Sequence, residues 1–551
     1  MNRRLKDVSA AGALLGLLFF AASLTPSLIP RGAFLQGVLG GISMALGYLC
    51  WRIVMGVWRL ADLPELRGRA RQTALAVAGV LIGGLFLWIL WNSLSWQNEL
   101  RALMEIPPVD SAHIPTILIV AALIFALALL LGAGFRWLLR LVRGRLYRVM
   151  PERRANVIGF VLVVLGLFVL TRDGLYDTVV TGLDESYEAA QSLFETAPPP
   201  PSDRDRVGGA ASLIDWGGLG EPGRNFVTEG PDAEAISAFT GEPALDPIRV
   251  YVGRANGETP QERAELALAE LQRQGAFERD VLVVASPTGT GWLDPGSHDP
   301  LEYMHGGDIA TVAAQYSFLQ SPLALILETD AGLEQATIML EAVHEYWKTL
   351  PPDARPRLYV HGLSLGAWSS MYATNLFRLV DDPIDGALWV GPPFPSAFWN
   401  YVQNARNDDS PWVLPQIEDG ALVRYANHFV DGSEAAAEWG EMRIMFLQYA
   451  SDPIVFYDPA SLWRPPAFLR DPPAEDASGR MRFMPVVTQF QLALDMALSF
   501  GAPPGYGHAY YAQDYIVPWV EVSAPEGWTA EDTARLKAHC DLGFQQGCDN
   551  G

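Results

Sequence analysis

Cysteine is scarce in this chain, and the cysteines that are present do not form a metal-binding pattern. The 551 residues include three cysteines, at positions 50, 540 and 548. Cys540 and Cys548 have no second cysteine or histidine pair beside them, so their spacing does not match that of a zinc site. Two interpretations of this pair remain open: a disulfide formed in an oxidising compartment, or two free thiols in a C-terminal tail.

Positive charge is also in deficit, which argues against a nucleic-acid partner. The chain carries 39 Lys and Arg against 62 Asp and Glu, a formal net charge of −23, whereas proteins that bind nucleic acid neutralise phosphates with basic side chains. The glycine-rich stretch 287–292, Pro-Thr-Gly-Thr-Gly-Trp, invites comparison with a phosphate-binding loop. It has neither the lysine nor the G-x-G-x-x-G spacing of such loops, which excludes nucleotide binding. We expect no metal, cofactor or nucleotide.

Charged residues of both signs are scarce in the first third of the chain, where long apolar runs replace them. Residues 1–172 contain 18 Lys and Arg but 7 Asp and Glu, a net charge of +11, which leaves −34 for residues 173–551. The apolar runs lie at 8–30, 33–58, 73–91, 114–135 and 155–172. Each is close to the roughly 20 residues that a helix needs to cross a bilayer. The pattern predicts a transmembrane region of about five helices over residues 1–172.

The basic residues that flank these runs predict an orientation in the lipid bilayer. They gather before the first run, between the second and third, and between the fourth and fifth, as Arg3, Arg4 and Lys6, as Arg59, Arg67, Arg69 and Arg71, and as Arg136, Arg140, Arg143, Arg145, Arg148, Arg153 and Arg154. The positive-inside rule then places the N-terminus in the cytoplasm, and five crossings place the chain after residue 172 outside. Cleavage of the first run as a signal peptide near Ala21-Ala22-Ser23 would leave that side unchanged. Loss of the marginal fifth crossing would place the C-terminal domain in the cytoplasm.

The acidic remainder of the chain has the pattern of an α/β domain. Residues 173–206 predict an amphipathic helix over 173–196 and then a proline-rich extended linker. Over 207–551, expected strands at 248–252, 281–285, 358–360, 387–390, 442–449 and 515–520 alternate with expected helices at 260–274, 332–350 and 367–379. This alternation predicts a mostly parallel sheet with helices on both faces. The stretch 461–486 is rich in proline and aromatic residues, which suits either a cap insertion over an active-site mouth or a surface loop.

One serine between two glycines carries the strongest catalytic signal. Gly362-Leu363-Ser364-Leu365-Gly366 follows the expected strand 358–360 and precedes a helix-like segment. A strand, then G-x-S-x-G, then a helix is the context of a nucleophile elbow, in which a sharp turn exposes the serine hydroxyl to a cleft. The pentapeptide also occurs by chance in loops without chemistry, but this context favours Ser364 as a nucleophile.

An acid partner for Ser364 is expected after the next-to-last strand, because the chain order in such sheets is Ser, then Asp or Glu, then His. Asp452 follows the expected strand 442–449 at its carboxyl end, where the active-site groups of parallel sheets collect. A turn residue before proline is the non-catalytic interpretation of Asp452, and Asp458 is the second choice for the acid.

Two histidines follow Asp452, and His508 is the better candidate for the base. It lies in a glycine-rich loop, 505–510, from which an imidazole can reach a cleft, whereas His539 lies in a charged terminal helix. His361, next to the elbow, is expected to be a packing residue. In such a triad the imidazole takes the serine proton, and the carboxylate fixes the tautomer of the imidazole.

The tetrahedral intermediate of acyl transfer needs two backbone N–H donors. We expect one from Leu365, the residue after the nucleophile. For the second donor two positions remain open. Strand counting favours the turn at Gly253 and Arg254, and the alternative is the glycine-rich stretch at Thr288 and Gly289.

Taken together, these motifs resemble those of bacterial membrane-anchored α/β-hydrolase family proteins, which combine a multi-span N-terminal region with a C-terminal hydrolase domain. The resemblance covers almost the whole chain and rests on Leu24-Thr25-Pro26-Ser27-Leu28-Ile29-Pro30-Arg31, on Ser286-Pro287-Thr288-Gly289-Thr290-Gly291-Trp292, on His361-Gly362-Leu363-Ser364-Leu365-Gly366 and on the glycine-framed His508. It implies a serine hydrolase fold and a catalytic role for Ser364. Together with the predicted orientation, the expected location is a bacterial inner membrane, with the catalytic domain periplasmic or extracytoplasmic.

The expected function is cleavage of acyl esters, from lipid or envelope-associated substrates, through an acyl-serine intermediate. Two other functions remain open. In an acyltransferase, an envelope glycan or lipid hydroxyl would take the acyl group in place of water. In a membrane scaffold, the hydrolase-like domain would carry no catalysis.

Overall fold

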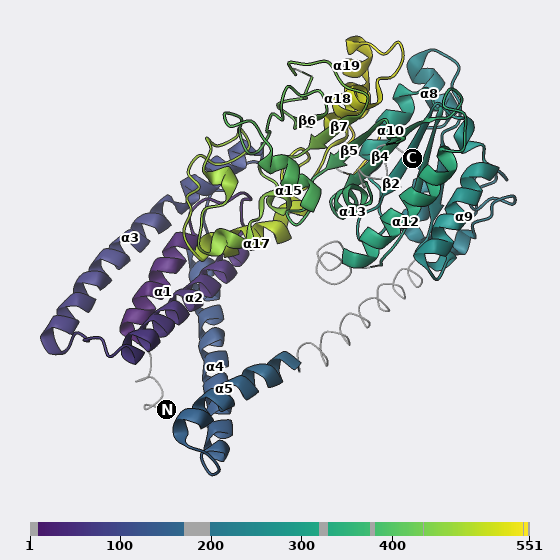
Figure 1. The fold of residues 1–551 in the computed structure, drawn as a ribbon. Helices are drawn as coiled ribbons and strands as arrows, with labels where there is room; N and C mark the ends of the chain where they lie inside the picture. Colours follow the sequence, from purple (N-terminus) through teal and green to yellow (C-terminus); the bar gives the residue numbers. More distant parts are fainter. Residues whose placement is uncertain are drawn as a thin grey trace. The chain divides into compact units, whose positions relative to one another are not determined.

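A computed structural model describes residues 9–169, 199–318, 329–374, 381–433, 435–543 and 545–548 (Figure 1). The chain divides into two compact units. The first contains residues 1–181 together with two later segments, 457–473 and 477–498, and the second contains residues 182–456, 474–476 and 499–551. The predicted amphipathic helix over 173–196 lies outside the described residues. Of the linker that follows it, residues 199–206 are described.

The first unit begins with five helices over the region where apolar runs are expected. They are α1 (Ala10–Ser23), α2 (Ala33–Leu60), α3 (Gly68–Leu103), α4 (Ile114–Leu146) and α5 (Glu152–Val169). Three of the described helices, α2, α3 and α4, are long and apolar enough to cross a membrane. Helix α1 has 14 residues, shorter than the expected run over 8–30, because the sequence continues into Leu24-Thr25-Pro26 and proline limits the helix.

Glycines bring α1 and α2 into backbone contact. A Cβ built on Gly16 would lie 2.6 Å from the carbonyl oxygen of Met44, and one on Gly47 would lie 2.8 Å from that of Leu15. Any larger residue would push these helices apart, which is the same use of small residues that lets membrane helices pack closely.

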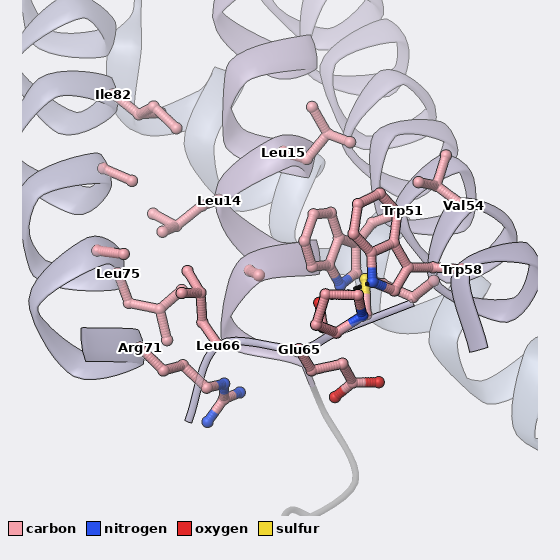
Figure 2. A pocket seen from close by; sticks show the side chains of 15 residues that line it. Leu14, Leu15, Trp51, Val54, Trp58, Glu65, Leu66, Arg71, Leu75 and Ile82 are labelled. Atoms are coloured by element: carbon pink, nitrogen blue, oxygen red, sulfur yellow. Dashed lines mark hydrogen bonds between the residues drawn. The ribbon is translucent and has the colours of Figure 1, made fainter. Parts of the chain in front are cut away.

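An apolar groove of about 550 Å³ lies between α1, α2 and α3. Figure 2 shows Leu14, Trp51 and Leu75 around it, with Glu65 and Arg71 at one end. The three helices therefore leave an apolar surface between them that suits hydrocarbon rather than water.

The later segment 477–498 joins this unit through a buried ion pair. Its helix α17 (Val487–Leu498) carries Asp495, whose carboxylate accepts hydrogen bonds from the Ser27 hydroxyl, from the Leu28 amide at 3.0 Å and from Arg31 Nε at 3.0 Å. The side chains of Arg31 and Asp495 are 1% and 0% exposed. The connection between α1 and α2 thus forms a binding site for the carboxylate of Asp495, which lies 464 residues after Arg31 in the chain.

The second unit is built on a sheet of seven strands in the order β1-β3-β2-β4-β5-β7-β6, with every neighbouring pair parallel. The strands are β1 (Ile248–Val252), β2 (Val281–Ser286), β3 (Ile309–Ala314), β4 (Arg357–Leu363), β5 (Gly386–Val390), β6 (Val423–Ala426) and β7 (Arg443–Leu447). Their residues are almost all buried, as continuous apolar strands covered on both faces require. The predicted fold class is confirmed, although β3 and β6 are absent from the sequence prediction.

Helices cover both faces of this sheet. The main ones are α9 (Pro260–Arg273), α10 (Pro295–Met304), α12 (Thr329–Trp347), α13 (Leu365–Ala373) and α18 (Ala512–Ser523). On β4, His361 contacts Ser297 of α10 and Trp519 of α18, whereas a Cβ on the next residue, Gly362, would point at Gly366 of α13. Because successive strand residues face opposite ways, α13 lies on one face, and α10 and α18 lie on the other.

Five shorter helices complete the described part of the second unit. They are α7 (Gly220–Thr228), α8 (Ala233–Thr240), α15 (Ala397–Asn404), α16 (Pro453–Phe456) and α19 (Ala530–His539).

The strand predicted at 515–520 is wrong, because this segment belongs to helix α18. Its β-favouring residues, Tyr515, Ile516, Val517 and Val520, suggested a strand, but the fully buried positions are Tyr515, Ile516, Trp519 and Val522. That spacing is the period of a helix with one buried face. The helix packs on β5 and β7, so burial on the sheet outweighs the local preference for extended backbone.

The buried ion pair between Arg31 and Asp495 predicts that a substitution of Asp495 strongly lowers the stability of the protein. Asp495→Ala removes the partner of a buried guanidinium and of two further donors, so we expect the free energy of unfolding to fall by about 3–5 kcal/mol. Denaturant unfolding of the purified protein measures this change. The exposed pair of Arg480 with Glu99, at 2.6 Å and 59% and 39% exposed, supplies the control, since Glu99→Ala is expected to cost about 0–1 kcal/mol. Equal losses in the two variants would contradict the structural role of Asp495.

Candidate active site

Ser364 occupies a strained turn between β4 and α13. Its backbone has φ 58° and ψ −122°, while β4 ends at Leu363 and α13 begins at Leu365. A non-glycine residue in this region of backbone space costs of order 1–3 kcal/mol, and such strain concentrates at functional sites. The Ser364 amide donates to the carbonyl of Val390 at 2.9 Å, so the neighbouring strand β5 holds the turn in place.

The two glycines of the motif are required by close backbone approach. A Cβ on Gly366 would lie 2.0 Å from the carbonyl oxygen of Ser286, and one on Gly362 would lie 2.3 Å from the backbone of Gly366. Both contacts are shorter than any real Cβ contact, and backbone cannot rotate away as a side chain can. Close backbone contact therefore requires glycine on both sides of Ser364, which is itself buried and lines the cavity described below.

His508 and Asp452 are bound to each other. The Nδ1 atom of His508 lies 2.6 Å from Oδ2 of Asp452, and the two residues are 3% and 0% exposed. The same Oδ2 accepts from the Tyr510 hydroxyl at 2.9 Å, while Oδ1 accepts from the Ile454 amide at 2.8 Å. Burial raises the pKa of Tyr510, so its hydroxyl remains a donor. The carboxylate is thus fixed by three groups and orients the imidazole.

A second carboxylate, Asp476, holds the loop that carries His508. Its Oδ2 accepts from both the amide and the hydroxyl of Ser451, each at 2.8 Å, and the Ser451 hydroxyl accepts from the Gly507 amide at 3.0 Å. Sequence analysis missed both Asp476 and Ser451. The pair Ser451-Asp452 next to a buried strand was the available signal, but nothing local pointed to Asp476.

Ser364 and His508 open onto one cavity of about 140 Å³. Its lining comes from the loop after β2, the elbow, the His508 loop and the C-terminal segment: Thr288, Thr290, Trp292, Asp294, Leu363, Ser364, Phe500, His508, Tyr510 and Gln545. The Nε2 atom of His508 is buried and has no hydrogen-bond partner among the described residues. The two residues therefore share one cavity, the second imidazole nitrogen is unoccupied, and in this structure Ser364 and His508 are not hydrogen-bonded to each other.

The two open positions for the second oxyanion donor are placed very differently. Gly253 and Arg254 follow the edge strand β1, their amides donate to the side chains of Asn256 and Gln315, and neither residue lines the cavity. That alternative is therefore not supported by the structure, because β3 and β2 lie between β1 and β4.

The glycine-rich stretch, in contrast, follows β2, which pairs directly with β4. Thr288 lines the cavity, although its amide already donates to the Trp292 carbonyl at 3.0 Å. Gly289 lies between two lining residues, Thr288 and Thr290, without lining the cavity itself, and its amide has no hydrogen bond within the described part of the chain. Leu365 begins α13, so its amide is one of the first-turn donors without an intrahelical partner.

The other candidate residues have structural partners instead. Asp458 caps a 3-10 turn by accepting from the Ala460 amide at 2.8 Å. His361 is buried, with Nδ1 2.8 Å from the Leu388 carbonyl and Nε2 2.9 Å from Ser297 Oγ, in agreement with a packing role. His539 Nε2 lies 3.1 Å from the Tyr303 hydroxyl.

No group of three or more His, Cys, Asp and Glu within the described residues is arranged to hold a metal ion.

Asp294 adds a titratable group to the cavity that sequence analysis did not identify. It is 4% exposed, and burial raises the pKa of its carboxyl to about 7, while a hydrogen bond from the Tyr515 hydroxyl at 2.7 Å opposes this shift. It also caps α10 by accepting from the Gly296 amide at 3.0 Å. The only local signal was its position before Pro295, as an N-cap followed by proline.

Comparison with known protein families gives two matches. Residues 248–536 match the model described as "Alpha/beta-hydrolase family", and residues 24–231 match the model described as "Alpha/beta-hydrolase family N-terminus". The first match spans more than half of the chain. A search of curated proteins and a search of solved structures found no match.

The glycine contacts predict that Gly366→Ala is severely destabilising. The added methyl group would overlap the Ser286 carbonyl, so we expect a loss of about 3 kcal/mol or more in the free energy of unfolding. Gly440→Ala is the control, because its Cβ would lie 3.4 Å from the nearest atom. Thermal unfolding of the two variants separates them, and a Gly366→Ala protein as stable as the control would contradict the backbone contact.

Asp294 predicts a specific pH dependence of stability. In the unfolded chain an aspartate ionises near pH 4, whereas the folded carboxyl keeps its proton until pH is about 7. Between these values the folded state binds the extra proton, so stability falls as pH rises, by at most about 1.4 kcal/mol per pH unit. Asp294→Asn removes this slope, and the midpoint of its thermal transition should exceed that of the wild type increasingly from pH 4.5 to 7.5. A difference between the two midpoints that stays constant over this pH range would contradict the raised pKa of Asp294.

Proposed function

The chain belongs to the alpha/beta-hydrolase family, and from this premise we propose that it is a serine hydrolase that cleaves acyl esters through an acyl-serine intermediate. One observation carries the proposal. Ser364, on a strained elbow, and His508, bound to Asp452, line the same cavity, and the Nε2 atom of His508 is buried with no hydrogen-bond partner among the described residues.

In the first half of the reaction, Ser364 Oγ attacks the carbonyl carbon of the ester. Nε2 of His508 takes the serine proton as the new C–O bond forms, and it then gives that proton to the departing alcohol oxygen as the old C–O bond breaks. The product is an ester of Ser364. Asp452 supports the step because its carboxylate stabilises the imidazolium and keeps Nδ1 protonated.

In the second half, water attacks the acyl-serine while His508 takes a proton from the water. The proton returns to Ser364 Oγ as the carboxylic acid leaves. The negative charge on the carbonyl oxygen in both halves falls near the N-terminus of α13. The Leu365 amide, together with Gly289 from the loop after β2, supplies the donors that stabilise this charge.

Attachment to a lipid bilayer is the second part of the proposal. Three apolar helices of sufficient length support it, as does the placement of arginines in the α2–α3 connection and at the end of α4. By the positive-inside rule these ends face the cytoplasm. With α5 as a further crossing, the acidic catalytic unit is on the far side of a bacterial inner membrane, where lipid and envelope acyl esters are available substrates.

Activity-based labelling tests the proposal. The purified full chain should react with a fluorophosphonate probe and release p-nitrophenol from p-nitrophenyl acetate. Ser364→Ala should abolish labelling, and it should lower kcat by a factor of about 10⁴ or more because no nucleophile remains. Ser370→Ala, a buried serine on the same helix that is absent from the cavity lining, is the matched control.

The outcomes separate the alternatives. A wild-type protein that the probe does not label would overturn the proposal and favour a non-catalytic scaffold. Labelling without release of free acid, together with acyl transfer to an added sugar or lipid alcohol, would instead show that an alcohol replaces water in the second step.

A further inference from the structure

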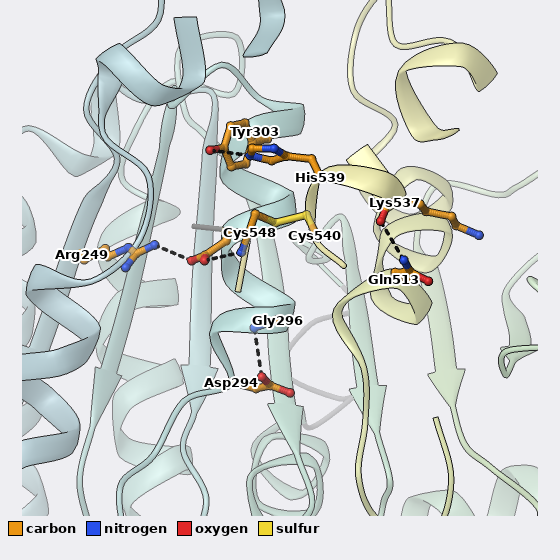
Figure 3. Close-up of a disulfide and its surroundings, with 10 residues drawn as sticks. Arg249, Asp294, Gly296, Tyr303, Gln513, Lys537, His539, Cys540 and Cys548 are labelled. Atoms are coloured by element: carbon orange, nitrogen blue, oxygen red, sulfur yellow. Dashed lines mark hydrogen bonds and ion pairs between the residues drawn. A yellow bond between two sulfur atoms is a disulfide. The ribbon is translucent and has the colours of Figure 1, made fainter. Parts of the chain in front are cut away.

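The active-site cavity takes one wall from the extreme C-terminal segment of the described chain. Gln545 lines the cavity beside Ser364 and His508, and it belongs to the segment closed by a disulfide between Cys540 and Cys548. Figure 3 shows this disulfide beside α10. The disulfide resolves the open interpretation of the two cysteines, and their side chains are buried, at 0% and 2% exposed.

The disulfide loop is also anchored to the sheet by a buried charge network. The Cys548 amide donates to Oδ2 of Asp299 at 3.0 Å, and Oδ1 of Asp299 lies 2.9 Å from Nη2 of Arg249 on β1. Arg249 is paired with Glu302 as well. Gly547 leaves room for this contact, because a Cβ there would lie 1.6 Å from Asp299 Oδ2. The end of the loop is therefore fixed to the body of the second unit.

The backbone of Gln545 has a conformation that is unfavourable for residues other than glycine. Its backbone has φ 59°, in the left-handed region that costs free energy for residues other than glycine. Its side chain is exposed at the rim of the cavity, and its carboxamide has no hydrogen bond within the described part of the chain. The carboxamide thus offers two donors and an acceptor to a molecule bound in the cavity.

The size and lining of the cavity limit what it accepts. Its volume of about 140 Å³ is well below the roughly 300–1,000 Å³ of pockets that enclose drug-sized ligands. Hydroxyl groups of Thr288 and Thr290 and the carboxamide of Gln545 share the lining with the aromatic rings of Trp292 and Phe500. A cavity of this volume and lining fits a short acyl group beside a polar alcohol.

We propose that the substrates are esters of short acyl groups, from acetyl to butanoyl, and that Gln545, positioned by the Cys540–Cys548 disulfide, sets this length limit. The inference rests on the proposed hydrolase function of Ser364. Without the disulfide, the segment from 541 to 547 loses its covalent closure, and the Gln545 wall no longer blocks the space beyond the acyl group.

The acyl-length profile tests this proposal. For the wild type, kcat/KM should fall at least about tenfold from p-nitrophenyl butanoate to p-nitrophenyl octanoate, since excluded methylenes in a pocket are worth that factor or more. Gln545→Ala and the double variant Cys540→Ala/Cys548→Ala should each raise the ratio of kcat/KM for the octanoate to kcat/KM for the butanoate at least about threefold. Gln546→Ala, the adjacent residue that does not line the cavity, should keep the wild-type profile.

The controls keep the two proposals separate. A wild-type protein that neither binds fluorophosphonate nor cleaves any ester refutes the hydrolase function. A wild type that is labelled but cleaves octanoate as fast as butanoate refutes the short-acyl inference alone. An unchanged acyl-length profile in Gln545→Ala refutes the role of Gln545. Because this variant retains the disulfide, it tests that role even if the double variant does not fold. An unchanged profile in a folded double variant refutes the role of the disulfide.

Discussion

The contact between the backbone of Gly366 and the Ser286 carbonyl is the constraint on which the rest of the active site depends. It brings the first turn of α13 against the end of β2, with 2.0 Å between that carbonyl oxygen and the position a Cβ would occupy. The loop after β2 consequently lies next to the elbow and contributes Thr288, Thr290 and Trp292 to the cavity. The strained turn at Ser364 persists because β5 also binds it, through the Val390 carbonyl.

The imidazole side of the cavity is held by two carboxylates with different tasks. Asp452 contacts the ring of His508 directly, whereas Asp476 acts on the loop through Ser451 and the Gly507 amide. Both oxygens of Asp452 accept hydrogen bonds, whereas for Asp476 the two donors of Ser451 meet on Oδ2 alone. The rigidity of the loop follows from this arrangement, since a flexible glycine-rich segment alone would not hold the ring in one place.

The segment between Asp452 and His508 gives a structural role to two side chains of the N-terminal motif Leu24–Arg31, those of Ser27 and Arg31. Residues 457–473 and 477–498 belong to the first unit, and the carboxylate of Asp495 is bound there by Ser27, Leu28 and Arg31. The chain therefore leaves the second unit after the strand that carries the acid and returns to it before the loop that carries the histidine. None of these residues lines the described cavity, so the cap over 461–486 stays a prediction.

The sequence by itself determined whatever has a local signature: the apolar helices, five of the seven strands, and a serine placed between a strand and a helix. Order along the chain was enough to select Asp452 and His508, which the folded chain brings within 2.6 Å. Only the tertiary structure decided the helical state of 512–523, the position of Gly253 and Arg254 away from the cavity, the partner of Arg31 and the wall formed by Gln545. Each of these depends on contacts between residues far apart in the chain, where burial and backbone approach outweigh local preference and leave no periodic trace in the sequence.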